Sequence, residues 1–381
     1  MHVAIVHDWL TGMRGGEKVL RLICRCFPNA DLFTLVHVKG SCHQEIERMR
    51  IRTSCLNDIP AVERIYRCLL PAMPMAIEQF DADQYDLILS SSHCVAKGIV
   101  RSPRSLHICY CHSPMRYVWA QGDAYHRTLG WKALPLKLFR GYLRAWDRRS
   151  ATHVDHFIAN SVNVAGRIRA NYGREAEVVY PPIDIEFFCP TGIEREDFYL
   201  MVTAMAPYKR VDQAIEAFAS LAKPLVIIGS GQQYRKLRLT APANVRLLGW
   251  QSDEVVRDHF RRCRALIFPG EEDFGMVPLE AMACGAPVIA YGAGGATETV
   301  RCIKAAANGP ATGMCYQPQT SEALAAAVRE FEERADEFDP GQIAQWVKQF
   351  SEQVFLTKYR NIVNRLLRQR GMFEPCQAAL S

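Results

Sequence analysis

Two glutamates, Glu272 and Glu280, stand with seven residues between them in a segment that predicts the start of a helix. Pro278 suits a first helical position and apolar residues after it recur at helical spacing, so we expect a helix that Glu280 opens. The unpaired amides of that first turn, with Gly275 beside them, attract phosphate. Ionised carboxylates only accept hydrogen bonds, so two of them beside a phosphate indicate hydroxyl groups, as in a ribose and a sugar. The alternative is a loop–helix junction with two solvated acids.

A cationic segment follows another predicted strand. Lys209 and Arg210 stand between the predicted strand Tyr199–Val202 and the helix after it, at the end of the sheet where ligands collect. An ammonium and a guanidinium suit a diphosphate leaving group, because they share its developing negative charge. The alternative is a charged first turn that faces solvent.

Three further segments follow predicted strands. Gly15 and Gly16 precede a helix expected over Glu17–Cys26, and glycines there let backbone amides approach a ligand. His112 follows the strand Leu106–Cys109, although a lone histidine is more often structural. A loop from Leu248 to Gln251 follows a strand of the second half.

The glutamate segment, with the helix stop, turn and buried strand at 284–290, resembles the E-x7-E motif of the retaining glycosyltransferases of family 4, which have the GT-B architecture. The resemblance implies that Glu272 lies by the transferred sugar and that Glu280 binds the donor ribose. It also implies that His112 approaches the transferred sugar and that the loop at Gly15 and Gly16 holds the donor diphosphate.

The candidate site follows from these segments and the resemblance. The candidate catalytic residues are Glu272, His112 and Lys209. The candidate donor-binding residues are Gly15, Gly16, Lys209, Arg210, Gly249, Trp250, Phe274, Gly275, Met276, Val277 and Glu280. The family pattern usually has an arginine five residues before the lysine, where this chain has Ala204, so whether Arg210 supplies the missing guanidinium is open.

Strand and helix patterns alternate through both halves, which predicts an α/β protein with two doubly wound parallel sheets. With the resemblance, we expect GT-B: two Rossmann-like domains that face each other across a cleft. The expected domains are an acceptor-binding domain over 1–185, a nucleotide-sugar-binding domain over 190–350, and a helix over 351–371 that returns to the first domain. The predicted strands are His2–Val6, Leu32–Val36, Leu87–Ser90, Leu106–Cys109, His156–Ala159, Tyr199–Val202, Leu225–Ile228, Val245–Leu247, Ala265–Phe268 and Val288–Ala290.

The net charge of +6 belongs to the first half of the 381 residues, because 1–190 hold 24 Lys and Arg against 18 Asp and Glu. Much of this excess falls in 127–149, where basic residues alternate with aromatic and aliphatic ones. Such a pattern is typical of a helix that lies on anionic lipid. The alternative is a domain helix whose apolar face enters the core.

No apolar run approaches the length of a membrane span and the first residues lack the order of a signal peptide, so we expect a cytoplasmic protein, or one peripheral on the inner face of the plasma membrane. The 14 cysteines include no C-x2-C pair, which favours reduced thiols over zinc sites or disulfides. Asp81 and Asp83 have metal-binding spacing but precede a strand, so they lie at the wrong end of the sheet for a metal site. Lys209, Arg210 and the helix amides can stabilise a departing diphosphate, so neither a metal nor a cofactor is expected.

The chain therefore resembles a retaining glycosyltransferase, and in the segments Tyr110–Pro114 and Pro207–Arg210 it most closely resembles the mannosyltransferases that build O-antigen and exopolysaccharide units. That resemblance implies transfer of mannose from GDP-mannose, a nucleotide-sugar, to a polyprenyl-diphosphate-linked saccharide. The alternatives are a nucleotide-sugar epimerase of the same fold and a non-catalytic nucleotide-binding subunit. Nucleic acid is not an expected partner, because the charge is modest and no recognition module is present.

Overall fold

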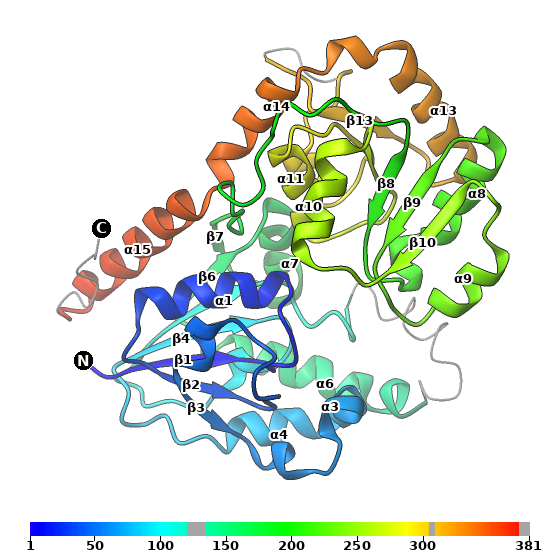
Figure 1. The fold of residues 1–381 in the computed structure, drawn as a ribbon. Helices are drawn as coiled ribbons and strands as arrows, with labels where there is room; N and C mark the ends of the chain where they lie inside the picture. Colours follow the sequence, from blue (N-terminus) through cyan, green and yellow to red (C-terminus); the bar gives the residue numbers. More distant parts are fainter. Residues whose placement is uncertain (120–133, 305–308, 373–381) are drawn as a thin grey trace. The chain divides into compact units, whose positions relative to one another are not determined.

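The computed structural model describes residues 1–119, 134–304 and 309–372. The chain divides into two compact units, each built around its own parallel sheet (Figure 1). Unit 1 comprises Met1–Pro182 with Gln353–Ser381, and unit 2 comprises Ile183–Glu352. The first boundary falls directly after two consecutive prolines, which lack amide hydrogens and so interrupt regular structure.

Unit 1 has a seven-stranded sheet in the order β3-β2-β1-β4-β5-β6-β7, in which every neighbouring pair is parallel. The strands are β1 (Val3–His7), β2 (Asp31–Thr34), β3 (Arg50–Thr53), β4 (Leu87–Ser92), β5 (Leu106–Cys111), β6 (His156–Ala159) and β7 (Ala176–Val178). Every residue of β2, β4 and β5 is buried, as expected for parallel strands covered on both faces. The strand order reverses between β1 and β4, so the connections after these two strands lead to opposite faces.

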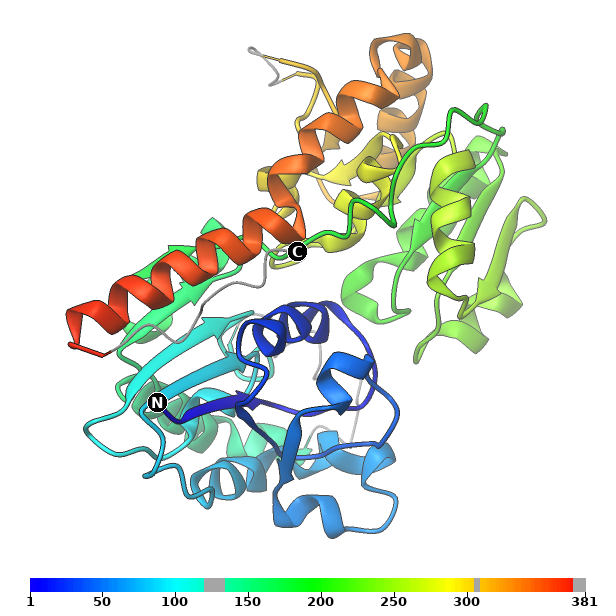
Figure 2. The same ribbon diagram turned by 60° about the vertical axis from the view of Figure 1, so that its left-hand side comes forward.

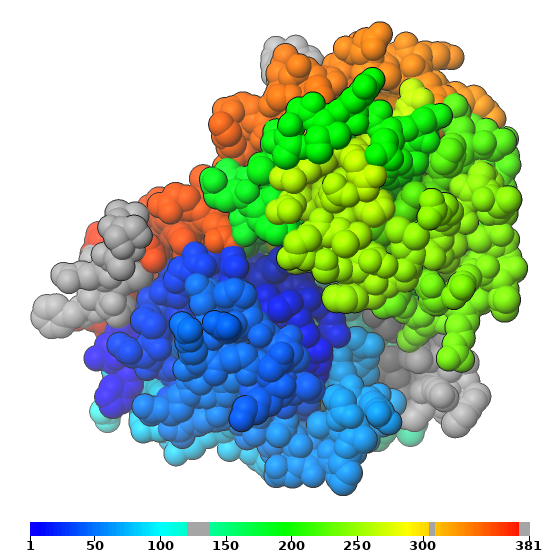
Figure 3. Space-filling model, in the orientation of Figure 1, coloured from blue at the N-terminus to red at the C-terminus, as the bar shows by residue number. Residues whose placement is uncertain are grey.

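Helices cover both faces of this sheet (Figures 1 and 2). On one face α1 (Gly15–Cys26) and α15 (Glu352–Gln369) share a hydrophobic cluster with the strands. On the other face α4 (Met73–Glu78) and α6 (Leu134–Ala151) pack in a second cluster, and α7 (Val162–Tyr172) packs in a third. The remaining short helices are α2 (Gln44–Glu47) and α3 (Val62–Ile65). In space-filling form, the blue N-terminal residues make up much of the surface of unit 1 on the side drawn in Figure 3.

The last helix belongs to unit 1 through its apolar face. Phe355, Tyr359 and Val363, spaced four residues apart, are at most 2% exposed and join the core cluster of the sheet. The ring centroid of Phe355 lies 5.8 Å from that of Tyr110 in β5. Helical spacing alone predicts this apolar stripe, and the sheet supplies the surface that buries it.

Unit 2 has a six-stranded parallel sheet in the order β10-β9-β8-β11-β12-β13. Its strands are β8 (Tyr199–Val202), β9 (Leu225–Ile228), β10 (Val245–Gly249), β11 (Leu266–Phe268), β12 (Val288–Tyr291) and β13 (Gly313–Tyr316). Its helices are α8 (Val211–Leu221), α9 (Tyr234–Thr240), α10 (Asp253–Arg262), α11 (Met276–Ala283), α12 (Ala296–Thr299), α13 (Ser321–Glu333) and α14 (Pro340–Val347). α13 packs against α8, β12 and β13, whereas α11 packs against α10, α14 and β11. Here the strand order reverses between β8 and β11.

The prediction of an α/β protein with two doubly wound parallel sheets is confirmed. All ten predicted strands are present; three have the predicted ends, and the ends of the others differ by at most two residues. The sequence missed β3, β7 and β13, three short strands toward the edges of the sheets. β3 reads Arg-Ile-Arg-Thr and β7 has only three residues, so neither gives the apolar run that marks a buried strand.

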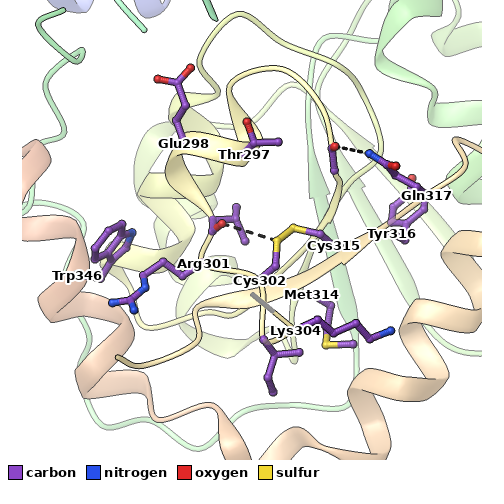
Figure 4. Close-up of a pocket in the computed structure, with 13 residues that line it drawn as sticks. Thr297, Glu298, Arg301, Cys302, Lys304, Met314, Cys315, Tyr316, Gln317 and Trp346 are labelled. Atoms are coloured by element: carbon purple, nitrogen blue, oxygen red, sulfur yellow. Dashed lines mark hydrogen bonds between the residues drawn. A yellow bond between two sulfur atoms is a disulfide. The ribbon is translucent and has the colours of Figure 1, made fainter. Parts of the chain in front are cut away.

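A disulfide between Cys302 and Cys315 corrects the expectation of fully reduced thiols (Figure 4). Cys302 pairs with Gly313 of β13 in an isolated β-bridge. The Cα atoms of Cys302 and Cys315 are consequently 5.4 Å apart. A separation of 13 residues carries no recognisable motif, so only the pairing of these two backbone segments reveals the bond. The cysteines of the described part outside this pair are not disulfide-bonded.

Candidate functional site

The carboxyl edge of the unit 2 sheet brings two of the predicted site residues together. Lys209 ends a short 3₁₀ helix (Pro207–Lys209) after β8, and Glu272 lies in the turn after β11. Because β8 and β11 flank the point where the strand order reverses, their following loops lie where α/β sheets bind ligands. The Lys209 ammonium donates a hydrogen bond to Glu272 Oε1 and forms an ion pair with it.

Close backbone packing makes this ion pair possible. A Cβ added at Gly270 would lie 3.1 Å from Lys209 Cα and 3.2 Å from the Tyr208 carbonyl oxygen, so glycine lets the two loops approach. The Lys209 and Glu272 side chains remain 14% and 22% exposed. An ammonium has three N–H donors, so Lys209 keeps two for a further acceptor such as a phosphate oxygen.

The loop after β12 holds the backbone of Glu272. The Gly295 amide donates to the Glu272 carbonyl at 2.8 Å. A Cβ added at Gly295 would lie 2.3 Å from Phe274 Cα, which shows how closely this loop covers the glutamate segment. The position of the Glu272 carboxylate is therefore fixed both through its side chain and through its main chain.

The helix after Glu272 starts two residues earlier than predicted. Its first residue is Met276 rather than Pro278, because Gly275 adopts a φ of +90° and acts as the N-cap. Glu280 consequently lies one turn inside α11 instead of opening it, and it is buried at 7% exposure. The free amides at this helix start belong to Met276 and Val277, next to Phe274, which is itself buried.

Arg210 has a left-handed backbone conformation with φ of +56° and precedes α8 as its N-cap. Such a conformation is uncommon outside glycine and is found at functional sites. The Arg210 Nε atom is buried, and within the described part of the chain it has no hydrogen-bond partner. The same is true of the Tyr316 hydroxyl at the end of β13. Burial raises the pKa of Tyr316, and the nearby charge of Arg210 opposes that shift.

The predicted loop from Leu248 to Gln251 lies at the carboxyl end of β10. Gly249 ends that strand with a φ of +73°, and Trp250 follows with 75% of its surface exposed. β10 is an edge strand of the sheet, two strands away from β8. Gly249 and Trp250 thus lie on the same sheet edge as Lys209, two strands away from it.

Unit 1 has a second polar cluster, at the switch point between β1 and β4. Gly15 and Gly16 form the first turn of α1, two residues before the predicted start. A Cβ added at Gly16 would lie 3.8 Å from His112 Nε2, so the glycine and the histidine are neighbours. His112 Nε2 lies 2.8 Å from Ser91 Oγ. Burial, with His93 and His7 nearby, lowers the pKa of His112 well below its usual value.

Asp8, which the sequence did not single out, organises this cluster. Its carboxylate accepts four backbone hydrogen bonds, from residues 93 to 96, at 2.6 to 3.1 Å, and His93 Nδ1 lies 3.0 Å from Oδ2. Burial opposes ionisation of Asp8, but the adjacent His93 and His7 hold the pKa of this carboxyl below its usual range. Asp8 directly follows β1 and His93 directly follows β4. This shared position after two buried strands is the feature of the sequence that could have identified the pair.

A second acid, Glu17, also belongs to the cluster. Glu17 Oε1 lies 3.9 Å from His7 Nε2, and Glu17 Oε2 accepts from the Arg14 amide as part of the cap of α1. Burial opposes the ionisation of Glu17, while the contacts with His7 lower its pKa. Among the described residues, no group of three or more His, Cys, Asp and Glu side chains is arranged to hold a metal ion.

Comparison with known proteins identifies the family. Residues 13–187 match the model of a family described as Glycosyltransferase Family 4, and residues 185–340 match the model described as Glycosyl transferases group 1. The chain belongs to the family 4 (group 1) glycosyltransferases of GT-B fold. The family resemblance seen in the glutamate segment is thereby confirmed, whereas specificity for mannose stays a prediction.

Relatives of this glycosyltransferase chain match it over a limited span. An uncharacterized glycosyltransferase of Methanocaldococcus jannaschii is 33% identical over 162 residues, which cover 41% of this chain and 46% of the relative. D-inositol 3-phosphate glycosyltransferase of Nocardiopsis dassonvillei is 29% identical over 180 residues, or 38% of this chain and 42% of the relative. The chain thus spans less than half the length of these curated relatives.

Solved structures share the glycosyltransferase fold. Anabaena HepE in complex with UDP and glucose has a TM-score of 0.69 at 18% identity, and the match covers 95% of this chain and 99% of that one. Sucrose-phosphate synthase from Thermosynechococcus elongatus has a TM-score of 0.70 at 16% identity, with coverage of 97% and 100%. At such identities the likeness is one of fold.

The basic segment over 127–149 lies partly in α6 (Leu134–Ala151). Residues 127–133 lie outside the described residues. In α6, Arg140 and Arg144 each donate from Nε to the Val118 carbonyl, at 3.4 and 2.6 Å, so these arginines contact the protein. Arg148 and Arg149 of the same helix are exposed. The exposed apolar stripe of α6 consists of Leu138, Phe139 and Tyr142, exposed at 80%, 40% and 48%.

The same helix also enters the core, as the alternative for this segment expected. Leu143 and Trp146 are buried in the second cluster of unit 1. None of the helices in the described ranges combines the length and the apolar character needed to cross a bilayer.

A cavity of about 630 Å³ lies beside the disulfide in unit 2 (Figure 4). Its lining includes the Cys302–Cys315 pair, Tyr316, and Arg301, whose guanidinium carbon lies 4.9 Å from the Trp346 ring centroid. None of the predicted site residues lines it. Tyr316 both lines this cavity and lies near Arg210.

Proposed function

We propose that this protein is a retaining glycosyltransferase that moves a hexose from a nucleotide-sugar to a hydroxyl group of a lipid-linked saccharide in polysaccharide biosynthesis. The observation that carries the proposal is the Lys209–Glu272 ion pair at the β8/β11 switch point, because it sets a cation and a hydroxyl acceptor side by side. The family match of both halves of the chain supports the same reaction class.

The chemistry of this proposal is electrostatic. As the bond between the sugar and the diphosphate breaks, negative charge develops on the diphosphate oxygens. Lys209, Arg210 and the free amides of Met276 and Val277 would stabilise that charge, and they require no rearrangement to do so. Glu272 would accept hydrogen bonds from the sugar, and Glu280 from the ribose. With these groups, the proposed transfer needs neither a metal ion nor a cofactor.

The sugar donor is proposed as GDP-mannose, on the resemblance of the 110–114 and 207–210 segments to mannosyltransferases. A second candidate is a UDP-sugar, because HepE, a structural neighbour, was solved with UDP and glucose. A thermal-shift screen with GDP, UDP, ADP and their sugars separates these donors, since a ligand that binds only the folded state raises the melting temperature. Stabilisation by GDP-mannose alone supports the first, and stabilisation by UDP-glucose alone replaces it.

The acceptor is proposed as a polyprenyl-diphosphate-linked saccharide that reaches the protein at an anionic membrane surface. The name of the Nocardiopsis relative suggests D-inositol 3-phosphate as the competing acceptor. Transfer of labelled sugar to synthetic polyprenyl-diphosphate saccharides and to D-inositol 3-phosphate distinguishes the two. Conversion of the nucleotide-sugar without release of nucleoside diphosphate would instead indicate an epimerase, and binding without any turnover would indicate a non-catalytic subunit.

A further inference from the structure

The disulfide of unit 2 is connected, through a single loop, to the backbone of Glu272. We propose that the Cys302–Cys315 bond is a redox modification site, and that a dithiol reductant opens it and thereby loosens Glu272, the residue proposed to bind the transferred sugar. This inference rests on the proposed function and adds a regulation of the same site. The residues that carry it all belong to unit 2.

The disulfide is open to a small reagent. Cys302 and Cys315 are both half-buried, and both line the cavity of about 630 Å³ (Figure 4). That volume is many times the space that a single water molecule occupies, so a small dithiol fits beside the bond. A disulfide sealed in the core would meet a reductant only after unfolding.

The connecting loop, here called the glycine loop, comprises residues 292–295 and starts against Cys315. A Cβ added at Gly292 would lie 3.6 Å from Cys315 Cβ, which is van der Waals contact. The Gly292 amide donates to the Tyr316 carbonyl at 3.1 Å, and the Gly292 carbonyl accepts from Gln317 Nε2 at 2.6 Å (Figure 4). The first residue of the glycine loop is therefore fixed to the strand that carries Cys315.

The end of the glycine loop touches the backbone of Glu272. The Gly295 amide donates to the Glu272 carbonyl at 2.8 Å, and a Cβ added at Gly294 would lie 2.5 Å from the same carbonyl oxygen. Backbone groups this close move together. A displacement of the glycine loop consequently displaces Glu272, whose carboxylate pairs with Lys209.

The second cysteine follows the helix that leaves the glycine loop. Cys302 comes shortly after α12, whose last residue is Thr299. Two backbone hydrogen bonds hold this segment to the start of β13, from the Thr312 amide to the Arg301 carbonyl at 2.9 Å and from the Ile303 amide to the Gly313 carbonyl at 3.0 Å.

The disulfide adds a covalent bond to these hydrogen bonds. Residues 292–302 thus form a frame that is joined to β13 at both ends and holds Glu272 between them. Reduction leaves only hydrogen bonds at the Cys302 end, and such a segment opens locally more often than a cross-linked one. Glu272 is then held less firmly.

The chemical step is thiol–disulfide exchange with a dithiol. A thiolate of the reductant attacks one sulfur of the pair and forms a mixed disulfide, and the other cysteine leaves as a thiolate that takes up a proton. The second thiol of the reductant then attacks the mixed disulfide and releases the first cysteine. The protein gains two electrons and two protons, and the reductant leaves as a disulfide. A cytoplasmic location, which the sequence led us to expect, would place the pair beside such reductants.

Two other cysteines of unit 2 do not join the exchange. Cys263 and Cys284 are buried, and burial raises the pKa of each thiol to about 12. The reactive form of cysteine is the thiolate, so these two remain thiols at neutral pH and do not scramble the pair.

The test compares the full chain before and after reduction by dithiothreitol, with the state of the pair read by alkylation and mass spectrometry. The donor is whichever of GDP-mannose and UDP-glucose supports faster transfer. We expect reduction to lower kcat/KM for the donor at least about fivefold, the lower end of the usual coupling between linked sites. Reoxidation with oxidised glutathione should restore it.

Two cysteine variants show where the reductant acts. Cys302→Ser should have the low kcat/KM with and without dithiothreitol. The matched control is Cys189→Ser, at a half-buried cysteine of unit 2 outside the pair, which should respond to dithiothreitol as wild type does. The comparison of oxidised with reduced wild type needs no substitution, so it decides the inference even where a variant fails to fold.

Three results would overturn the inference and leave the proposed function intact. They are equal kcat/KM for oxidised and reduced wild type, unbonded thiols at 302 and 315 after treatment with oxidised glutathione, and a response to dithiothreitol that persists in Cys302→Ser. A wild type that transfers no sugar in either state would instead overturn the proposed function. Calorimetric titration would then decide the inference, because reduction should lower the affinity for the nucleotide-sugar and leave that for the nucleoside diphosphate unchanged.

Discussion

Lys209 and Glu272, 63 residues apart in the sequence, form an ion pair at the carboxyl edge of the second sheet. The pair exists because β8 and β11 are neighbours in the sheet and because Gly270 allows their loops to touch. Each partner has a separate task in the proposed reaction, since the ammonium faces developing charge and the carboxylate accepts from hydroxyls.

Replacing Glu272 by alanine should abolish sugar transfer and leave nucleotide binding intact. The variant loses the hydroxyl acceptor but keeps Lys209, which becomes free to bind phosphate, so the affinity for nucleoside diphosphate should be unchanged or raised a few-fold. Nucleoside diphosphate release measures turnover, and calorimetric titration measures binding. The matched control is Glu271→Ala, the exposed acid one residue earlier, which should retain activity. Turnover of Glu272→Ala within threefold of wild type would refute the assigned role.

Adding one methyl group at Gly295 should displace the backbone that positions the Glu272 carboxylate. The new Cβ would overlap the Phe274 backbone at 2.3 Å, and backbone cannot yield as a flexible side chain can. We expect Gly295→Ala to lower the stability by about 1–3 kcal/mol, as overpacking usually does, and to reduce transfer. Gly292→Ala, in the same loop, meets side chains at 3.5 Å or more and should be tolerated. Equal melting temperatures for the two variants would contradict this picture.

Stability should decrease in acid because of His107. This fully buried histidine lies 2.8 Å from Ser90 Oγ through Nε2, and burial, helped by Arg101, lowers its pKa to about 3. A histidine in the unfolded chain titrates near 6.5, so its contribution is complete above that pH and is lost as the pH falls from about 6.5 toward 3. Across this window His107 should reduce the free energy of unfolding by about 1.4 kcal/mol per pH unit.

The comparison of wild type with His107→Gln isolates the contribution of His107 to the pH dependence of stability. Glutamine does not titrate, so this variant lacks the one proton that His107 takes up on unfolding. In urea unfolding between pH 4 and 7, its free energy of unfolding should therefore change less steeply with pH than that of wild type. His153→Gln should keep the wild-type dependence. Parallel curves for wild type and His107→Gln would show that this ring is not the titrating group.

Lipid binding, if it involves α6, should depend on the exposed apolar stripe and not on the arginines that contact Val118. Changing Leu138, Phe139 and Tyr142 to glutamine should reduce sedimentation with vesicles that contain phosphatidylglycerol several-fold, with little change in melting temperature because all three are exposed. Leu239→Gln, at an equally exposed leucine of unit 2, is the control. Unchanged sedimentation of the triple variant would exclude this helix as the lipid contact.

Local patterns in the sequence predict much of the fold. The buried strands β1, β4, β8 and β12 are apolar runs followed by turn residues, and the stripe of α15 repeats at helical spacing, so each can be read from neighbours along the chain. The edge strand β3 could not, because alternating arginines look like a loop until a neighbouring strand pairs with them.

The candidate site divides in the same way. The residue types at Glu272, Lys209 and Gly275, together with their positions after strands, indicated phosphate and sugar chemistry without coordinates. Only the tertiary structure showed that Asp8 orients His93, that Cys302 is bonded to Cys315, and that α11 begins at Met276. Sequence spacing reports what lies one or two turns away, whereas a hydrogen bond between residues 85 positions apart depends on which strands become neighbours in the sheet.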